Sequence, residues 1–75
     1  MTVEEGQLKV LDYLGRSYTL MEGPAGPILK PPGLSRATLN VPPTVFRALV
    51  QSRRIVRDGE ITSEGGVTIK KWRMR

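Results

Sequence analysis

The sequence predicts an α+β fold, arranged as one domain over residues 1–75. Residues 3–14 and 44–54 place apolar side chains at helical spacing. Residues 17–30 and 55–72 have the composition and alternation of short strands. Segments rich in Gly and Pro separate these elements, and 75 residues suffice for one small domain only.

The composition argues against catalytic and metal sites. The chain has no Cys and no His, so it lacks the usual zinc ligands, the commonest general base and the best nucleophile. The hydroxyls of Ser35, Ser52 and Ser63 stand at no spacing that favours a lysine base. We therefore expect no enzyme activity, no metal and no cofactor.

Hydropathy and the N-terminus bear on location. The best apolar run, Val45 to Val50, is interrupted by Arg47, so no membrane-spanning helix is predicted. The first residues, MTVEEGQLK, are acidic where a secretory signal is basic and then apolar. Together with the lack of Cys, this predicts a cytoplasmic protein, and we expect a prokaryotic or phage source.

The net charge of +5 is concentrated in the C-terminal part of the chain. Residues 1–33 carry three basic and four acidic side chains, whereas residues 34–75 carry nine basic and three acidic ones. A basic half is the electrostatic footprint of a nucleic-acid partner, and acidic proteins are a second class of partner. A core of this size supplies only about 3–5 kcal/mol of net stability. A homodimer would bury more apolar surface and is therefore a further alternative.

The N-terminal segment predicts a helix from Val3 to Leu14. Thr2 and Glu5 have the spacing of a capping box, with Thr2 as the N-cap. Gly15 is expected in the left-handed position just past the helix end. This helix is expected to be scaffold that contributes leucines to the core.

The next segment predicts a β-hairpin. Residues 17–21 have strand composition, residues 22–27 are rich in turn formers, and residues 28–30 return before a proline pair. Residues 34–41 leave two alternatives: one helical turn capped by Ser35, or a third strand in which Ala37, Leu39 and Val41 alternate. Their composition favours the extended form.

Residues 44–54 predict the second helix, and the proline pair at 42–43 suits its start. Its apolar stripe is formed by Val45, Phe46, Leu49 and Val50, and its opposite face by Thr44, Arg47, Gln51 and Arg54.

The C-terminal segment predicts a β-meander of three strands. Residues 55–57 turn through Asp58-Gly59 into residues 60–62, and residues 63–66 turn into the last strand, 67–72. Val67 and Ile69 share a face and are expected to point inward. Trp72 has the opposite parity, so a bulge or a strand end near Lys71 would be needed to bury it with them.

Two resemblances follow from these residues. The helix Thr44–Arg54, the strand start Ile55-Val56 and the hairpin around 61–65 resemble the second half of a prokaryotic winged-helix domain, over roughly residues 42–70. The spacing of Val45-Phe46, Leu49 and Ile55 also resembles the small YjhX-like family. The chain departs from the winged-helix pattern because no clear second helix precedes Val41 and the hairpin 17–30 stands in its place.

The winged-helix resemblance implies duplex DNA binding by a small transcriptional regulator. Arg47, Gln51 and Arg54 would face the DNA, since Arg pairs bidentately with guanine and Gln with adenine. Other basic residues would contact phosphates. The predicted DNA-binding residues are Thr44, Arg47, Gln51, Arg53, Arg54, Arg57, Lys70, Lys71 and Arg73.

The alternative function is a protein-interaction module, an adaptor or inhibitor of a larger acidic partner. It would use the hairpin 17–30 or a sheet edge as its contact surface. The proline-braced loop 23–27 suits that role because a rigid loop loses little entropy on binding.

Overall fold

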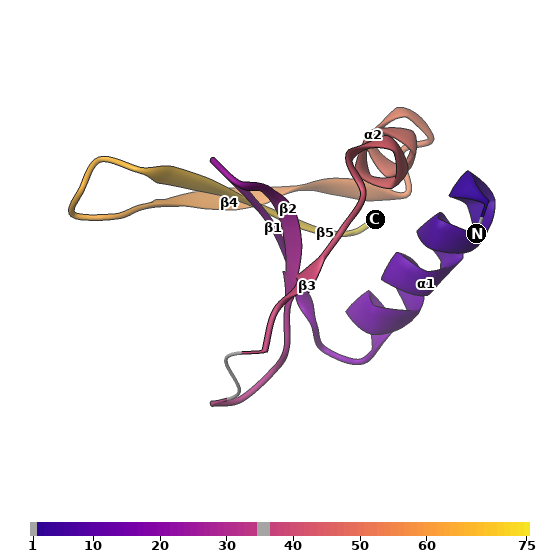
Figure 1. Ribbon diagram of the computed structural model, residues 1–75, viewed down its shortest axis with the longest axis horizontal. Coiled ribbons are helices and arrows are strands. Elements are labelled where there is room, and N and C mark those ends of the chain that lie inside the picture. The colour runs from indigo at the N-terminus through magenta and orange to yellow at the C-terminus, as the bar shows by residue number, and fades with distance from the viewer. Residues whose placement is uncertain (1, 35–36) are drawn as a thin grey trace.

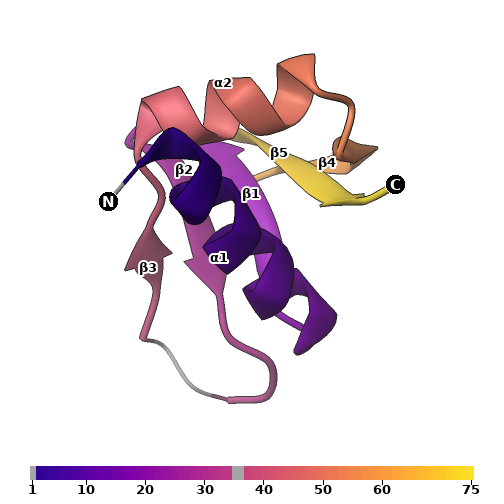
Figure 2. The ribbon, with the colours of Figure 1, turned by 90° about the vertical axis from the view of Figure 1, so that its right-hand side faces the viewer.

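Over the described residues, 2–34 and 37–75, the computed structural model contains two helices and one five-stranded antiparallel sheet. The strand order is β3-β2-β1-β5-β4, and both helices lie on the same face of the sheet (Figures 1 and 2). The predicted α+β class is confirmed. In chain order the elements are α1 (Val3–Gly15), β1 (Thr19–Gly23), β2 (Gly26–Lys30), β3 (Leu39–Asn40), α2 (Pro43–Gln51), β4 (Ile55–Thr62) and β5 (Thr68–Met74).

One apolar layer fills the space between the helices and the sheet. Leu20 and Leu29 are register partners on β1 and β2 and are 0% and 2% exposed. α2 packs over them with the apolar stripe that its sequence predicted. The buried members of this layer are Val10, Leu20, Leu29, Val41, Val45, Phe46, Leu49 and Ile55.

Helix α1 begins as predicted and ends differently. The Thr2 side chain accepts a hydrogen bond from the Glu5 backbone N–H at 3.1 Å, which caps the first turn. The predicted position of Gly15 is wrong, because Gly15 is the last helical residue and Ser17 adopts the left-handed φ of 72°. The N–H groups of Ser17 and Tyr18 then bond to the carbonyls of Leu14 and Tyr13, which is a Schellman motif.

Helix α2 ends at Gln51, three residues before the predicted end. Arg53 takes the left-handed φ of 59°, and its N–H bonds to the Val50 carbonyl. The Arg54 N–H bonds to the Leu49 carbonyl, so this terminus is also a Schellman motif with a non-glycine residue in the left-handed position. Arg54 therefore lies beyond the helix and not on its exposed face.

The hairpin of β1 and β2 is confirmed, with a shorter loop than predicted. Gly23 pairs with Gly26, so Pro24 and Ala25 alone form the tip. Pro27 is a buried strand residue, and its carbonyl accepts a hydrogen bond from the Val41 N–H at 3.0 Å.

The extended alternative for the following segment is confirmed at Leu39–Asn40, which form β3 against β2. The other alternative, a helical turn capped by Ser35, falls on a residue outside the described ranges.

The three-stranded C-terminal meander is wrong. Asp58 and Gly59 do not turn the chain: they form a bulge within the single strand β4, with two residues opposite Lys71 and Gly59 at φ 88°. The bulge lies in β4 and leaves β5 regular, so the side chains of β5 alternate strictly between the two faces of the sheet. Trp72, the register partner of buried Leu20, therefore faces the helices. Val67 and Ile69 have the opposite parity and do not point inward, contrary to prediction.

The close approach of α1 to α2 gives a prediction for Gly6. A Cβ at Gly6 would lie 2.6 Å from Val45 Cγ2, and Val45 is only 5% exposed. We expect Gly6→Ala to lower the free energy of unfolding by about 1–3 kcal/mol through overpacking, as measured by urea denaturation.

The matched control is Gly15→Ala, because nothing lies within 4 Å of a Cβ there. This substitution is expected to raise the free energy of unfolding by about 0.5–1 kcal/mol through helix propensity. Equal stability of Gly6→Ala and the unaltered protein would contradict the close contact.

Candidate nucleic-acid interface

The exposed face of α2 holds three of the predicted site residues together. Thr44, Arg47 and Gln51 are exposed, while Val45, Phe46 and Leu49 on the other side of the helix are buried. Residues 41–57 contain no Asp or Glu. Among the described residues, no carboxylate lies within ion-pair distance of Arg47. This face therefore offers a guanidinium and an amide to a ligand without competition from a carboxylate on the same helix.

Arg53 stands directly after α2 in a conformation that L-residues rarely adopt. Its φ of 59° is stabilised by the two backbone hydrogen bonds that end the helix. An arginine in this position costs about 1 kcal/mol relative to glycine. Backbone strain of this kind is often retained where the side chain has a function, and the Arg53 side chain is exposed.

Three other predicted residues are paired with carboxylates. Arg54 reaches Glu4 of α1 at 3.1 Å, Arg57 reaches Glu60 at 3.4 Å and Arg73 reaches Asp58 at 3.7 Å. All three pairs are exposed, and such pairs contribute about 0–1 kcal/mol each. Sequence spacing did not indicate the Arg54–Glu4 pair, because its members are 50 residues apart.

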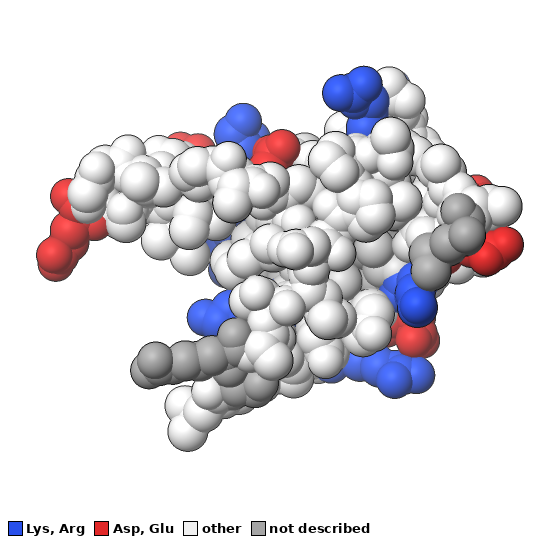
Figure 3. All heavy atoms as spheres, in the orientation of Figure 1, with Lys and Arg blue, Asp and Glu red and all other residues white. Residues whose placement is uncertain are grey.

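The remaining lysines divide between the two faces of the sheet. Lys70 shares the parity of Trp72 and lies on the helix side, whereas Lys71 and Arg73 lie on the other side. On the face that Figure 3 shows, basic side chains form separate groups and do not merge into one patch. The structure thus brings Thr44, Arg47 and Gln51 together, with Arg53 next to them in the chain, and places Lys71 and Arg73 elsewhere.

Trp72 is part of the core packing. Its ring meets Phe46 edge-on, with centroids 5.3 Å apart and an interplanar angle of 85°. The Arg57 guanidinium lies over it, 5.6 Å from the ring centroid. Its indole Nε1 is buried and has no hydrogen-bond acceptor. With Phe46 at one edge and Arg57 over a face, this ring is poorly placed to stack on a base.

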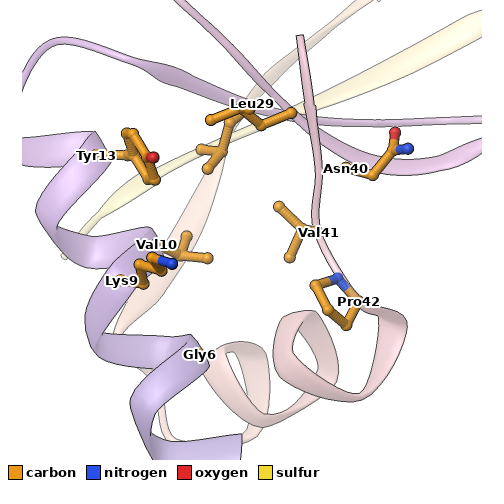
Figure 4. Close-up of a pocket in the computed structure, with 9 residues that line it drawn as sticks. Gly6, Lys9, Val10, Tyr13, Leu29, Asn40, Val41 and Pro42 are labelled. Carbon is orange, nitrogen blue, oxygen red and sulfur yellow. The ribbon is translucent and has the colours of Figure 1, made fainter. Parts of the chain in front are cut away.

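A separate groove of about 280 Å³ lies between α1 and the segment that links β3 to α2 (Figure 4). Val10, Leu29 and Val41 form its apolar wall, and the polar groups at it come from Lys9, Tyr13 and Asn40. Among the described residues that line this groove there is no Asp or Glu. Within the described ranges, no three Asp or Glu side chains gather in a way that could hold a metal ion.

Comparisons with protein families, curated proteins and solved structures find no match to this chain. Neither helix in residues 2–34 and 37–75 has the length and apolar character needed to cross a membrane.

The packing of Trp72 predicts a stability effect. Trp72→Ala removes the edge contact with Phe46 and part of the apolar layer, so we expect a loss of about 2–3 kcal/mol in the free energy of unfolding. Urea denaturation followed by circular dichroism measures this loss.

Trp72→Phe is the control, since it keeps an aromatic ring and removes the buried N–H that has no acceptor. It is expected to lose less than about 1 kcal/mol. If Trp72→Ala unfolded at the same urea concentration as the unaltered protein, the packing role would be rejected.

Proposed function

We propose that this protein binds duplex DNA through the exposed face of α2. The observation that carries the proposal is the exposed pair Arg47 and Gln51, one turn apart on a helix without carboxylates. Arg can contact guanine O6 and N7 bidentately, and Gln can contact adenine N6 and N7 in the same way. Thr44 lies one turn before Arg47 and adds a hydroxyl on the same face.

The position of α2 in the fold supports groove entry. In Figure 1, α2 lies at the upper margin of the molecule, and no other element lies beyond it. A helix of about 10–12 Å diameter fits a major groove of about 12 Å width. The apolar side of α2 is held by the core, so the exposed side is presented on a rigid element.

Three other residues of the predicted site, Arg53, Arg57 and Lys70, have a supporting role in this proposal. Arg53 would contact a phosphate at the end of α2, where the backbone fixes the start of its side chain. The β4–β5 hairpin projects from the body of the molecule (Figure 1), and Arg57 and Lys70 lie on its helix side. The proposal keeps from the winged-helix resemblance the use of one helix and one neighbouring hairpin.

The direct test is the double variant Arg47→Ala with Gln51→Ala. We expect its affinity for duplex DNA to fall by about 10–100-fold, since each bidentate base contact contributes about 1–3 kcal/mol. Its melting temperature should stay unchanged because both side chains are exposed. Fluorescence anisotropy with labelled duplexes at low salt measures the affinity.

Arg16→Ala is the matched control, because Arg16 is an exposed arginine at the far end of α1, paired with Asp12. It is expected to bind duplex DNA almost as well as the unaltered protein. An equal loss in Arg16→Ala, or no binding by the unaltered protein at low salt, would reject the proposal.

Arg53→Gly should change stability and binding in opposite directions. Glycine relieves the left-handed backbone, so the free energy of unfolding is expected to rise by about 1 kcal/mol. The loss of a phosphate contact should weaken binding and reduce the slope of log K against log salt by about one.

Ser17→Gly is its control, because Ser17 occupies the same backbone position at the end of α1. It is expected to gain stability with no change in DNA affinity. If Arg53→Gly gained stability and kept both the affinity and the salt slope, Arg53 would have no part in binding.

A further inference from the structure

The face of the sheet turned away from the helices is here named the outer face, and no helix or strand of the described residues covers it. Strand register places on it the side chains that alternate with Leu20, Leu29 and Trp72. Both helices lie on the opposite side, as Figures 1 and 2 show. Its central side chains Met21, Ile28 and Ile69 are partly exposed to solvent.

The centre of the outer face is apolar. Ile28 is the register partner of Met21, and both are partly exposed. Ile69 packs beside Gly23, whose Cβ would lie 3.7 Å from Ile69 Cγ1, and Ile69 is the partner of Ile61. Ile61 is 50% exposed. A contiguous apolar patch of this kind on a small protein indicates an interaction site.

The margin of this patch is basic. Lys30, Lys71 and Arg73 have outer-face parity. Of these three, Arg73 pairs with a carboxylate, Asp58 at the bulge, 3.7 Å from Arg73 Nε. Lys71 follows Met21 and Ile28 in the same row across the strands. The patch is thus apolar at its centre and net positive at its margin.

The β4–β5 hairpin borders the outer face on one side. The β4–β5 hairpin projects past the ends of β1 and β2 (Figure 1), and the chain extends 37 Å along its longest axis. Figure 3 shows a hollow beneath the hairpin on this side, with Lys or Arg atoms in it.

We propose that the outer face docks an acidic amphipathic helix of a partner protein. The apolar side of such a helix would cover Met21, Ile28 and Ile69, and its carboxylates would meet Lys30, Lys71 and Arg73. A second copy of this chain fits worse, because a two-fold interface would place the same cations against each other. Nucleic acid fits worse as well, because the patch centre is aliphatic and has no aromatic ring on which bases stack.

The test uses a defined probe with the unaltered protein. The probe is a labelled synthetic helix with Leu along one side and Glu on the rest, compared with a second peptide in which Lys replaces Glu. Fluorescence anisotropy is expected to show binding of the Glu peptide and none of the Lys peptide. Absence of binding by the Glu peptide, or equal binding of both peptides, would overturn the proposal.

Two adjacent lysines provide matched variants, because Lys70 and Lys71 lie on opposite faces of β5. Lys71→Glu is expected to weaken binding of the Glu peptide by about tenfold, and Lys70→Glu by less than about twofold. Ile61→Asp, at an exposed site on the hairpin, should also weaken it by about tenfold while the melting temperature stays within a few degrees. Equal losses in the two lysine variants would indicate unspecific charge attraction and reject the docking site.

Two further outcomes would assign the outer face to another occupant and overturn the proposal. The first is a dimer in sedimentation that is lost in Ile61→Asp. The second is a loss of duplex DNA affinity that is larger in Lys71→Glu than in Arg47→Ala with Gln51→Ala. Normal binding of the Glu peptide by the Arg47 and Gln51 double variant would show that the outer face binds the peptide independently of α2.

Discussion

The contact between α2 and the two leucines of the first hairpin is the constraint on which the rest of the structure depends. Leu20 and Leu49 are both fully buried, and the buried apolar residues of the described chain form one cluster around them. A domain this small has too little apolar surface to bury a second layer. The buried apolar cluster of the described residues therefore lies on one side of the sheet, and the opposite side and the β4–β5 hairpin remain open to other molecules.

The parts of the fold that sequence predicted correctly are those set by local patterns. The Thr2 cap and the apolar stripe of α2 follow from spacings of three and four residues. The helix ends were predicted wrongly because Ser17 and Arg53 took a backbone position that usually favours glycine. Their Schellman hydrogen bonds reach into the preceding helix and offset that preference.

The candidate site could also be predicted only where a local sequence pattern determines it. The exposed group of Thr44, Arg47 and Gln51 follows directly from helical periodicity. Whether Lys70 or Lys71 lies on the helix side depends on which set of alternating β5 side chains faces the core. Alternation alone favoured Val67 and Ile69, but the pairing of β5 with β1 placed the larger Trp72 opposite Leu20. Such long-range register cannot be read from one strand.

The bulge at Asp58 and Gly59 has a consequence for behaviour at high protein concentration. β4 forms one border of the sheet, and a straight border strand is a template on which further chains can add and polymerise. Gly59 bends this border, and Arg57, Asp58 and Glu60 line it with charges of both signs. We therefore expect the bulge at Asp58 and Gly59 to disfavour the addition of further chains along β4.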